Sequence, residues 1–347
     1  MQFDPYYTIT DQLLANIKRI NALVSELNNR RFPSVVLVEL EKMARALSTY
    51  ASTSIEGNPL PLTEVKKILK SKPAHIRESE KEVLNYNQAL QELNKKLEEE
   101  KVKLSIDLIL TIQKQITKGL LPKFESGKLR EKAVIVNDPR TRQVIYLPPD
   151  AKEVRFLVEN LVIFVNNNRG KIDPLILAGI FHKQMVIIHP FMDGNGRTAR
   201  LATKVLMAEL GLNTFNLFSF ENYYNKNVTK YFQIVGESGN YYELVDKIDF
   251  TPWLEYFTEG IIDELLRVQK LLPEIATKPE TELQPYHLKM LELIRSKGFI
   301  VDRDYARLVA RAKATRALDF KKMIELGLIE RKGKGKATYY VLFEKFR

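Results

Sequence analysis

Residues 189–200 place several groups that can do chemistry within twelve positions. His189 can accept a proton, and Asp193, four residues later, is a carboxylate that can ligate Mg²⁺. Gly194-Asn195-Gly196 forms a turn whose backbone N–H groups can approach an anion closely, because glycine has no side chain in the way. Arg197 and Arg200 follow in the first turn of an expected helix, whose N-terminus also favours anions. Together these groups are those needed to hold a nucleotide polyphosphate and to attack it.

Each of these residues alone has an ordinary structural interpretation. A single histidine near a helix end is usually structural, Gly-Asn-Gly is a common turn, and two arginines can form a solvated helix face. Their combination in one dodecamer favours a single reaction instead. In that reaction His189 accepts the proton of an incoming hydroxyl group as its oxygen attacks phosphorus.

A second informative segment spans residues 52–58, Ser-Thr-Ser-Ile-Glu-Gly-Asn. Ser52 and Glu56 stand four residues apart at the end of an expected helix, so they share a face. A glutamate at a helix C-terminus opposes the helix dipole, which favours a partner for it such as an arginine of the phosphate site. The ordinary alternative is a helix-ending signal at Gly57 with an incidental glutamate.

The composition is that of a globular protein with more than one domain. The chain has 347 residues, of which 45% are hydrophobic and 28% charged, and its length favours two or three domains. It contains no cysteine, which excludes disulfides, zinc-thiolate sites and thiol catalysis. Residues 1–5 lack the basic and apolar regions of a signal peptide, and no apolar run is long enough to span a bilayer. We therefore expect a cytoplasmic protein that does not enter a membrane.

Apolar residues recur at three- and four-residue steps along most of the chain, which predicts a mainly helical fold. We expect helices over residues 9–29, 33–56, 79–99, 105–118, 152–167, 197–210, 225–235 and 252–271, with a short helix from 63. Ser79 followed by Glu82 predicts a capping box. A helix that begins at Pro174 should deliver His189 at its C-terminal end. Two β-like runs, 134–136 and 144–147, flank a turn at 137–140 and predict a small hairpin.

The C-terminal part of the chain carries most of the positive charge. Residues 283–347 contain 16 Lys and Arg against 7 Asp and Glu, a balance of +9, whereas the whole chain has a net charge of +11. Three helical runs, 286–296, 302–311 and 314–326, precede two β-like runs, 328–331 and 338–342. This order resembles a winged helix-turn-helix.

Basic residues of this module lie on its third helix and on the glycine-rich segment between its strands: Lys313, Arg316, Lys321, Lys322, Lys332, Lys334 and Lys336. Their positions favour DNA binding through phosphates. A solvated basic face that docks a protein or a second copy of the chain is the alternative. Charge alone does not decide between the two.

The stretch from His189 to Arg200 resembles the Fic (Fido) family motif HPFx(D/E)GNGRxxR at every position. The resemblance covers about residues 100–272 and implies a helical Fic core with a β-hairpin flap. It implies transfer of AMP from ATP to a Ser, Thr or Tyr hydroxyl group of a target protein. His189 is then the base, Asp193 the Mg²⁺ ligand, residues 194–196 the anion hole, and Arg197 and Arg200 the phosphate clamps.

The same resemblance assigns two further groups of residues. Tyr231-Phe232 resembles the Tyr-Tyr pair that lines the adenine pocket of the family, with Phe232 in place of one tyrosine. Val144, Ile145 and Tyr146 resemble the flap strand, which aligns the target by main-chain pairing. The resemblance leaves a homodimer open.

Residues 52–58 resemble the inhibitory motif (S/T)xxxE(G/N) of the family, with Ser52, Glu56 and Gly57 at its defined positions. This implies that Glu56 pairs with Arg200 and takes the space of the γ-phosphate of ATP. An N-terminal position of the motif is typical of members restrained in cis. Removal of AMP, with Glu56 positioning a water, is a further activity that the resemblance leaves open.

The sequence therefore predicts a mainly α protein, organised in four segments: an N-terminal helical region with the inhibitory segment (1–99), a Fic core (100–272), a linker (273–285) and a winged helix-turn-helix (286–347). Two alternative functions stay open. One is a Fic enzyme with another donor, and the other is a DNA-binding regulator that senses a nucleotide without turnover. The intact His189 argues against the second, because a pure sensor has no use for a base.

Overall fold

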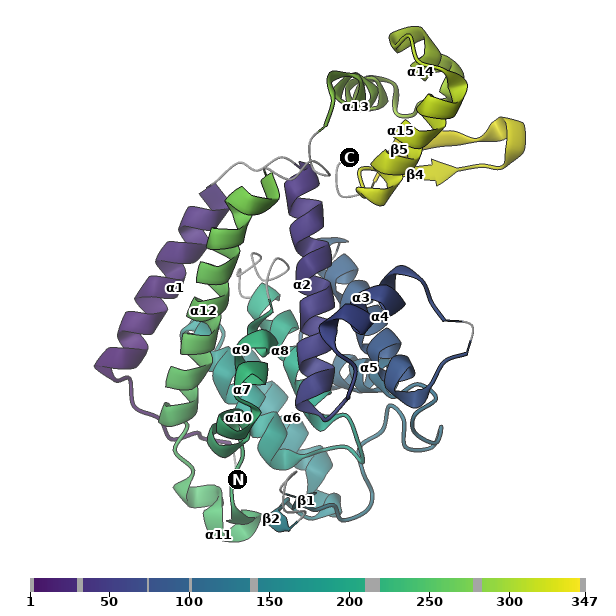
Figure 1. Cartoon of the computed structure of the whole chain (residues 1–347). Helices are drawn as coiled ribbons and strands as arrows, with labels where there is room; N and C mark the ends of the chain where they lie inside the picture. The colour runs from purple at the N-terminus through teal and green to yellow at the C-terminus, as the bar shows by residue number, and fades with distance from the viewer. Residues whose placement is uncertain are drawn as a thin grey trace. The chain divides into compact units, whose positions relative to one another are not determined.

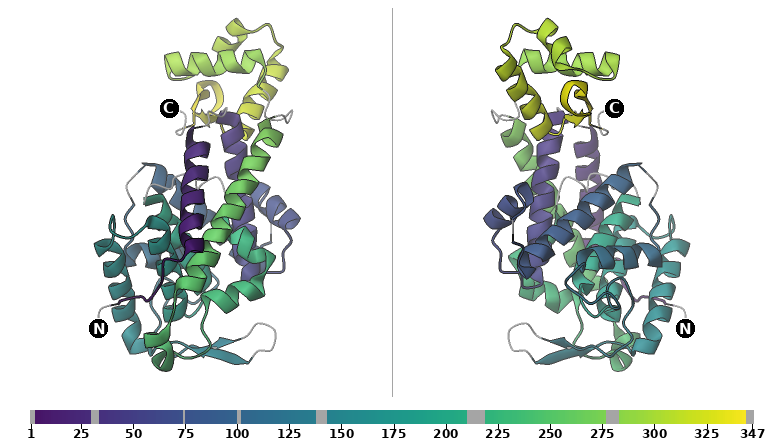
Figure 2. Two further views of the ribbon diagram at one scale, coloured as in Figure 1. Left: turned by 90° about the vertical axis from the view of Figure 1, so that its left-hand side faces the viewer. Right: turned by 90° about the vertical axis from the view of Figure 1, so that its right-hand side faces the viewer.

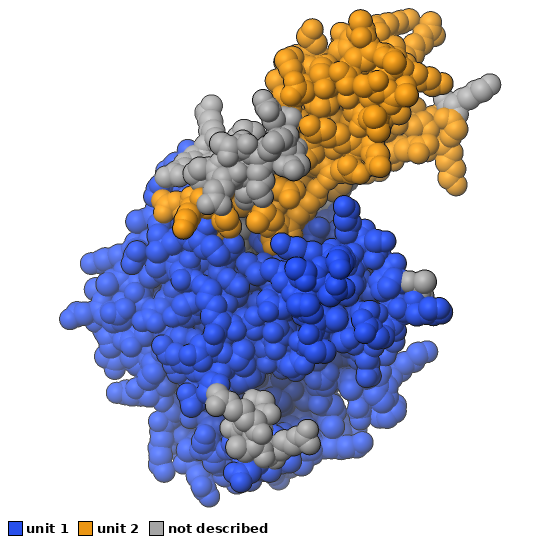
Figure 3. Space-filling view, in the orientation of Figure 1, with its two compact units in different colours: residues 1–29, 44–267 blue, residues 30–43, 268–347 orange. Residues whose placement is uncertain are grey.

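The computed structural model describes residues 3–29, 34–73, 75–99, 102–137, 143–209, 219–276 and 283–343. The chain divides into two compact units, which Figure 3 shows in different colours. Unit 1 consists of residues 1–29 and 44–267, and unit 2 of residues 30–43 and 268–347.

Helices make up most of unit 1, as the sequence predicts (Figure 1). In chain order they are α1 (Asp11–Asn29), α2 (Ser34–Ile55), α3 (Leu62–Lys70), α4 (Glu78–Glu99), α5 (Ile106–Ile116), α6 (Ala151–Asn167), α7 (Pro174–Ile188), α8 (Asn195–Glu209), α9 (Phe220–Lys226), α10 (Val228–Val235), α11 (Tyr241–Leu244) and α12 (Thr251–Ala276). Helices α2 and α12 cross the division between the units, because residues 30–43 and 268–276 count with unit 2.

Helix α7 lies at the centre of unit 1, between α6 and α8. Nearly all its residues are buried, including the polar His182, Lys183 and Gln184, and the rest of its sequence is apolar all round. Such a helix can be stable only inside a core. Helix α8 contacts α4 and α5 as well as α7. The segment that joins α7 to α8 is residues 189–194, so the two central helices of the core position the whole dodecamer.

Helices α1 and α12 lie side by side, as Figures 1 and 2 show from three directions. Asn16 donates from Nδ2 to Thr258 Oγ1 at 3.0 Å, and the Thr10 hydroxyl donates to Glu255 at 2.5 Å. These contacts join residues that are more than 240 positions apart in the sequence. The N-terminal helix is therefore an integral part of unit 1.

A small three-stranded sheet lies at one end of unit 1 in the order β1 (Val136–Asn137), β2 (Val144–Leu147) and β3 (Gly239–Asn240). Strands β1 and β2 pair antiparallel, so the predicted hairpin is present, although β1 begins two residues later than predicted. Strand β3 pairs with β2 in parallel and was not predicted, because two residues carry no periodic signal. Most of the predicted turn at 137–140 lies outside the described residues, which resume at 143.

Within unit 2, residues 285–342 form three α-helices followed by two paired strands. They are α13 (Pro285–Lys297), α14 (Asp302–Leu308), α15 (Lys313–Glu325), β4 (Ile329–Lys332) and β5 (Tyr339–Leu342). Strands β4 and β5 are antiparallel, and Ile300 forms a bridge to Tyr340. A core that includes Met290, Tyr305 and Phe320 holds these elements together. The element order agrees with the sequence, whereas the winged helix-turn-helix stays a prediction.

The predicted linker over residues 273–285 overlaps the end of helix α12, whereas the other predicted boundaries stay predictions. Helix α12 continues through Pro273 to Ala276, and the units divide between 267 and 268, whereas the sequence predicts a linker over 273–285. Leu272 is buried, so the apolar face of the helix continues to the residue before Pro273, although a proline there removes an N–H donor and crowds the carbonyl group of the preceding turn. Residues 277–282 lie outside the described residues. No helix in the described part of the chain is long and apolar enough to cross a membrane.

Candidate active site

His189 follows the last residue of α7 and has a left-handed backbone conformation, with φ 50°. It is the only non-glycine residue with positive φ among those described, and this conformation is costly for a residue with a side chain. Burial of the ring lowers the pKa of His189 to about 4, although Glu56 and Asp193 oppose the shift. The imidazole is therefore neutral at neutral pH, the form in which it can accept a proton.

The glycine loop gives way directly to α8. Gly194 has φ 81°, and its carbonyl accepts the N–H of Thr198 at 2.8 Å in the first turn of the helix. The first N–H groups of α8 have no partner inside the helix and can bind an anion. The Asn195 side chain is buried and exchanges two hydrogen bonds with the main chain of Phe191, at 2.8 and 2.9 Å. Asn195 therefore shapes the loop, and only its main chain is left for the predicted nucleotide contact.

Arg200 is completely buried and pairs with Glu56. Its Nη2 donates to Glu56 Oε1 at 2.7 Å and to the Ser52 carbonyl at 2.9 Å, while Nε donates to Ser52 Oγ at 2.8 Å. A Cβ atom added to Gly196 would lie 2.2 Å from Glu56 Oε1. The Glu56 carboxylate therefore rests against the glycine loop at the N-terminus of α8, where a phosphate is expected. The pairing that the family resemblance implies is present.

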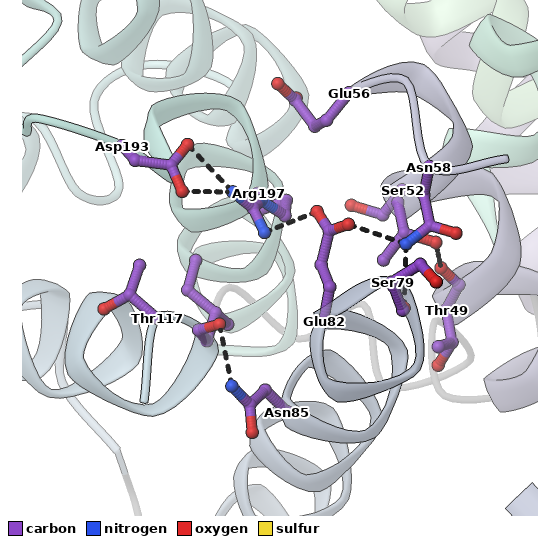
Figure 4. Close-up of polar contacts among 12 residues, drawn as sticks. Thr49, Ser52, Glu56, Asn58, Ser79, Glu82, Asn85, Thr117, Asp193 and Arg197 are labelled. Carbon is purple, nitrogen blue, oxygen red and sulfur yellow. Dashed lines mark hydrogen bonds and ion pairs between the residues drawn. The ribbon is translucent and has the colours of Figure 1, made fainter. Parts of the chain in front are cut away.

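Arg197 is held between two carboxylates (Figure 4). Its Nη2 donates to both oxygens of Asp193, at 2.9 and 2.8 Å, and its Nη1 pairs with Glu82 at 2.5 Å. The buried Nε of Arg197 has no hydrogen-bond partner. The predicted phosphate clamp thus has its terminal nitrogens engaged by acids, and the predicted metal ligand Asp193 is one of them.

Glu82 lies in the site, although the sequence predicts it as part of a helix cap. Helix α4 begins at Glu78, and Glu80 rather than Glu82 accepts the Arg77 N–H, at 2.9 Å. The predicted capping box is therefore wrong, because the helix starts one residue earlier. Glu82 points to Arg197 and accepts a hydrogen bond from Asn58 Nδ2 at 2.6 Å. Burial raises the pKa of Glu82, against the effect of Arg197.

Asn58 connects the end of the inhibitory segment to α4. Besides Glu82, its Nδ2 reaches the Ser79 carbonyl at 2.9 Å, as Figure 4 shows. Glu56 therefore contacts one arginine of the motif directly, and Asn58 contacts the other through Glu82. In the sequence, Asn58 is marked only by its position after Gly57. Glu82 is marked only as one of several charged residues on an expected helix.

Tyr231 and Phe232, predicted to line an adenine pocket, differ in burial. Tyr231 is 1% exposed and stacks on Tyr224, and its hydroxyl lies 3.1 Å from His182 Nε2 and 3.4 Å from Arg200 Nη1. Phe232 is half-buried. The hydroxyl of Tyr231 thus supports Arg200 from inside the core, and the adenine contact stays a prediction.

The flap strand β2 has one residue turned inward. Tyr146 is 3% exposed and donates from its hydroxyl to the Ile187 carbonyl at 3.0 Å, whereas Val144 is 51% exposed. Tyr146 pairs with Val136 on one side and with Gly239 on the other. Its main chain is therefore not open to a further strand, and the target-docking prediction narrows to Val144 and Ile145.

Several basic residues predicted to bind DNA are engaged within unit 2. Arg316 donates to both oxygens of Asp302 at 2.8 Å, and Lys332 pairs with Glu330 at 2.9 Å. Lys321 lies 3.9 Å from Glu325. These pairs reduce the charge that the module offers to phosphates, and DNA binding stays a prediction.

Residues 103–207 match the model of the Fic/DOC family. A protein of Caenorhabditis elegans named Protein adenylyltransferase fic-1 is 30% identical over 200 residues, which cover 56% of this chain and 38% of the relative. The Drosophila melanogaster Protein adenylyltransferase Fic is 27% identical over 219 residues, covering 58% and 43%. The chain thus spans about two fifths of the length of the curated relatives it matches.

Two solved structures share the fold. A Fic family protein from Desulfovibrio desulfuricans has a TM-score of 0.64 and 20% identity, with 99% of both chains covered. A fragment of Fic-1 from Caenorhabditis elegans has a TM-score of 0.59 and 24% identity, covering 76% of this chain and 73% of that one. At these identities the likeness concerns the fold alone.

Proposed function

We propose that this chain, whose residues 103–207 match the model of the Fic/DOC family, transfers AMP from ATP to a hydroxyl group of a target protein. One observation carries the proposal. A neutral His189 and the N-terminus of α8 lie on either side of one loop. The buried Arg200 faces the same loop, and the Glu56 carboxylate occupies the place beside it where an anionic ligand would bind. The names of the curated relatives, each a protein adenylyltransferase, support the same reaction.

The chemistry uses groups of the dodecamer. The hydroxyl oxygen of the target forms a bond to the α-phosphorus of ATP, the bond to the β-phosphate oxygen breaks, and pyrophosphate leaves. The proton of the hydroxyl group goes to His189, whose low pKa keeps the ring unprotonated before the attack. N–H groups at the start of α8 and the Arg200 guanidinium stabilise charge on the phosphate oxygens.

Asp193 fits a magnesium ion that arrives with ATP. Mg²⁺ commonly binds through one or two carboxylates together with phosphate oxygens and water. The Asp193 side chain is about half exposed beside the loop, and no three His, Asp or Glu residues among those described group together as a metal site. This donor set suits an ion shared with phosphates rather than a resident metal. When bound, Mg²⁺ would neutralise charge on the departing pyrophosphate.

Glu56 restrains this reaction in our proposal. Its carboxylate lies against Gly196 and neutralises Arg200, so a triphosphate that binds there meets a like charge and a neutralised arginine. A γ-phosphate can reach Arg200 only if Glu56 moves. The flap residues Val144 and Ile145 then offer a main-chain edge for the target segment, as strand addition requires.

The test is the covalent product. The Glu56→Gly variant is incubated with ATP and Mg²⁺, alone and with a cell extract, and adducts are identified by mass spectrometry. We expect an AMP adduct on the chain or on a target protein, and none with the double variant Glu56→Gly/His189→Ala. A phosphate adduct instead of AMP would assign another transfer. Loss of a pre-formed AMP adduct in the wild type would assign the removal reaction. Absence of any adduct in Glu56→Gly would refute the proposal.

A further inference from the structure

Arg130 is a buried arginine whose hydrogen bonds converge on the main chain around His189. Its side chain and backbone together are 3% exposed. Nε donates to the His189 carbonyl at 2.8 Å, and Nη2 to those of Pro149 at 2.5 Å and Ile188 at 3.5 Å. Nη1 donates to the Lys132 carbonyl at 3.1 Å. Each of these hydrogen bonds of the guanidinium group goes to a main-chain carbonyl oxygen.

The main chain of Arg130 adds a further contact to the same segment. Its N–H donates to the Pro190 carbonyl at 2.9 Å. Three consecutive carbonyl groups, of residues 188, 189 and 190, are therefore fixed by one residue. His189 has a left-handed conformation that costs free energy for a non-glycine residue. Such a conformation persists only where surrounding contacts determine it, and Arg130 supplies several of them.

These contacts also replace hydrogen bonds that the helix cannot make. The last carbonyl groups of an α-helix have no partner inside the helix. At the end of α7, Arg130 donates hydrogen bonds to the carbonyl groups of Ile188 and His189, and the Tyr146 hydroxyl donates one to the carbonyl group of Ile187. Tyr146 belongs to the flap strand, and Pro149 follows that strand by two residues. The hydrogen bonds of Arg130 and Tyr146 therefore connect the end of α7 to the flap.

We propose that Arg130 is a positioning residue for the transfer, which fixes the backbone of His189 and couples it to the flap. The inference rests on the proposed function. The flap places the target hydroxyl and His189 accepts its proton, so the distance between them is set through Arg130 and Tyr146. Only arginine suits this place, because its planar fork reaches several carbonyl groups at once, whereas a lysine has one ammonium group.

Charge gives Arg130 a second effect on His189. The charged groups that act on the His189 ring are Glu56, Asp193 and Arg130, of which the two acids raise its pKa and Arg130 lowers it. Desolvation is the largest cause of the low pKa. Removing Arg130 should therefore raise the pKa of His189 in two ways, by loss of a positive charge and by loosening the packing that excludes water.

The experiment compares Arg130→Lys and Arg130→Gln in the Glu56→Gly background. A displacement of about 1 Å can lower a rate about 10²-fold, so we expect kcat to fall by that order in both variants while the KM for ATP is unchanged. Tyr146→Phe, which removes one hydroxyl group, should lower kcat roughly fivefold for one lost hydrogen bond. Arg155→Gln is the matched control, because Arg155 is exposed on α6 and pairs with Glu159. It should leave kcat unchanged.

A readout independent of catalysis accompanies the rates. The chain has 4 histidines, so the ring signal of His189 can be assigned in NMR spectra and titrated. Its midpoint should lie above that of the Glu56→Gly parent in Arg130→Gln, because Arg130 lowers the pKa of His189, and should rise less in Arg130→Lys, which keeps the charge. Unchanged kcat in the Arg130 variants, or a change in KM alone, would overturn the inference. So would a His189 titration identical to that of the parent.

Failure of the proposed function would look different. If the Glu56→Gly parent forms no AMP adduct, the transfer is refuted, whereas the NMR titration still decides whether Arg130 fixes His189. If the Arg130 variants do not fold, Tyr146→Phe decides through kcat. An unchanged kcat in that variant then counts against the coupling.

Discussion

Replacing Glu56 should release the site, and the structure sets the size of the effect. The Glu56 side chain is 26% exposed and its partner Arg200 is 0% exposed, with 2.7 Å between Oε1 and Nη2. ATP must displace this carboxylate before a phosphate can meet Arg200. Glu56→Gln keeps the size of the side chain and removes its charge, so it isolates the electrostatic part, and Glu56→Gly removes the whole side chain.

A charge-assisted hydrogen bond contributes about 1.5–3 kcal/mol. Since about 1.4 kcal/mol corresponds to a factor of ten, removing the competing carboxylate should raise the rate at low ATP concentration about 10- to 150-fold. Arg200 keeps its bonds to Ser52 and Tyr231 in the variants, so it stays in place to receive a phosphate. The gain should come mainly from this single pair.

The assay measures incorporation of labelled AMP at several ATP concentrations in wild type, Glu56→Gly and Glu56→Gln. Glu64→Gln is the matched control, because Glu64 is exposed and pairs with the exposed Lys67. Its rate should equal that of wild type. Equal incorporation by wild type and both Glu56 variants, with each protein folded, would refute the inhibitory role of Glu56. A Glu56→Gln rate close to wild type with a raised Glu56→Gly rate would assign the effect to bulk rather than charge.

Two further results are expected. Because His189 must be unprotonated and its pKa is about 4, kcat/KM for ATP should be flat from about pH 5.5 to 8 and fall only as pH decreases towards that pKa; a fall centred near the ordinary histidine value of about 6.5 would contradict this. Glu221→Gln should reduce the free energy of unfolding by about 3–5 kcal/mol, measured by urea titration. The reason is that Glu221 is 0% exposed and lies 3.3 Å from the buried Lys204, which would lose its countercharge. The exposed Glu64→Gln serves as the control within about 0.5 kcal/mol, and an equal loss in both variants would refute the role of burial.

Much of the local structure follows from the sequence because its causes are local. The helices have strong apolar periodicity, and α7 and α8 are fixed further by Pro174 and by Gly194 between them. The short strand β3 and the extension of α12 past Pro273 were not predictable in the same way. Both depend on what the segment packs against, since two strand residues have no decisive propensity of their own, and Pro273 by itself favours a helix end.

Local sequence signals also explain why some site residues were predicted and others were not. The sequence predicts Asp193 and Arg197 as site residues because they lie within eight positions of His189 in the same segment. The sequence predicts a cap for Glu82 and gives no signal for Arg130, because each lies in a charged segment that could equally face solvent. Only their burial shows that these charged groups need, and have, specific partners.

The sequence by itself determined the chemical groups of the site and their order, because residues 189–200 are contiguous and a tight loop between two helices keeps neighbours in sequence close in space. Only the tertiary structure decided which distant groups engage them. Glu56 meets Arg200 across 144 positions, and Arg130 meets His189 across 59. With 43 acidic and 54 basic residues in the chain, composition allows many pairings, and helix packing selects among them because only a few charged groups are buried next to each other.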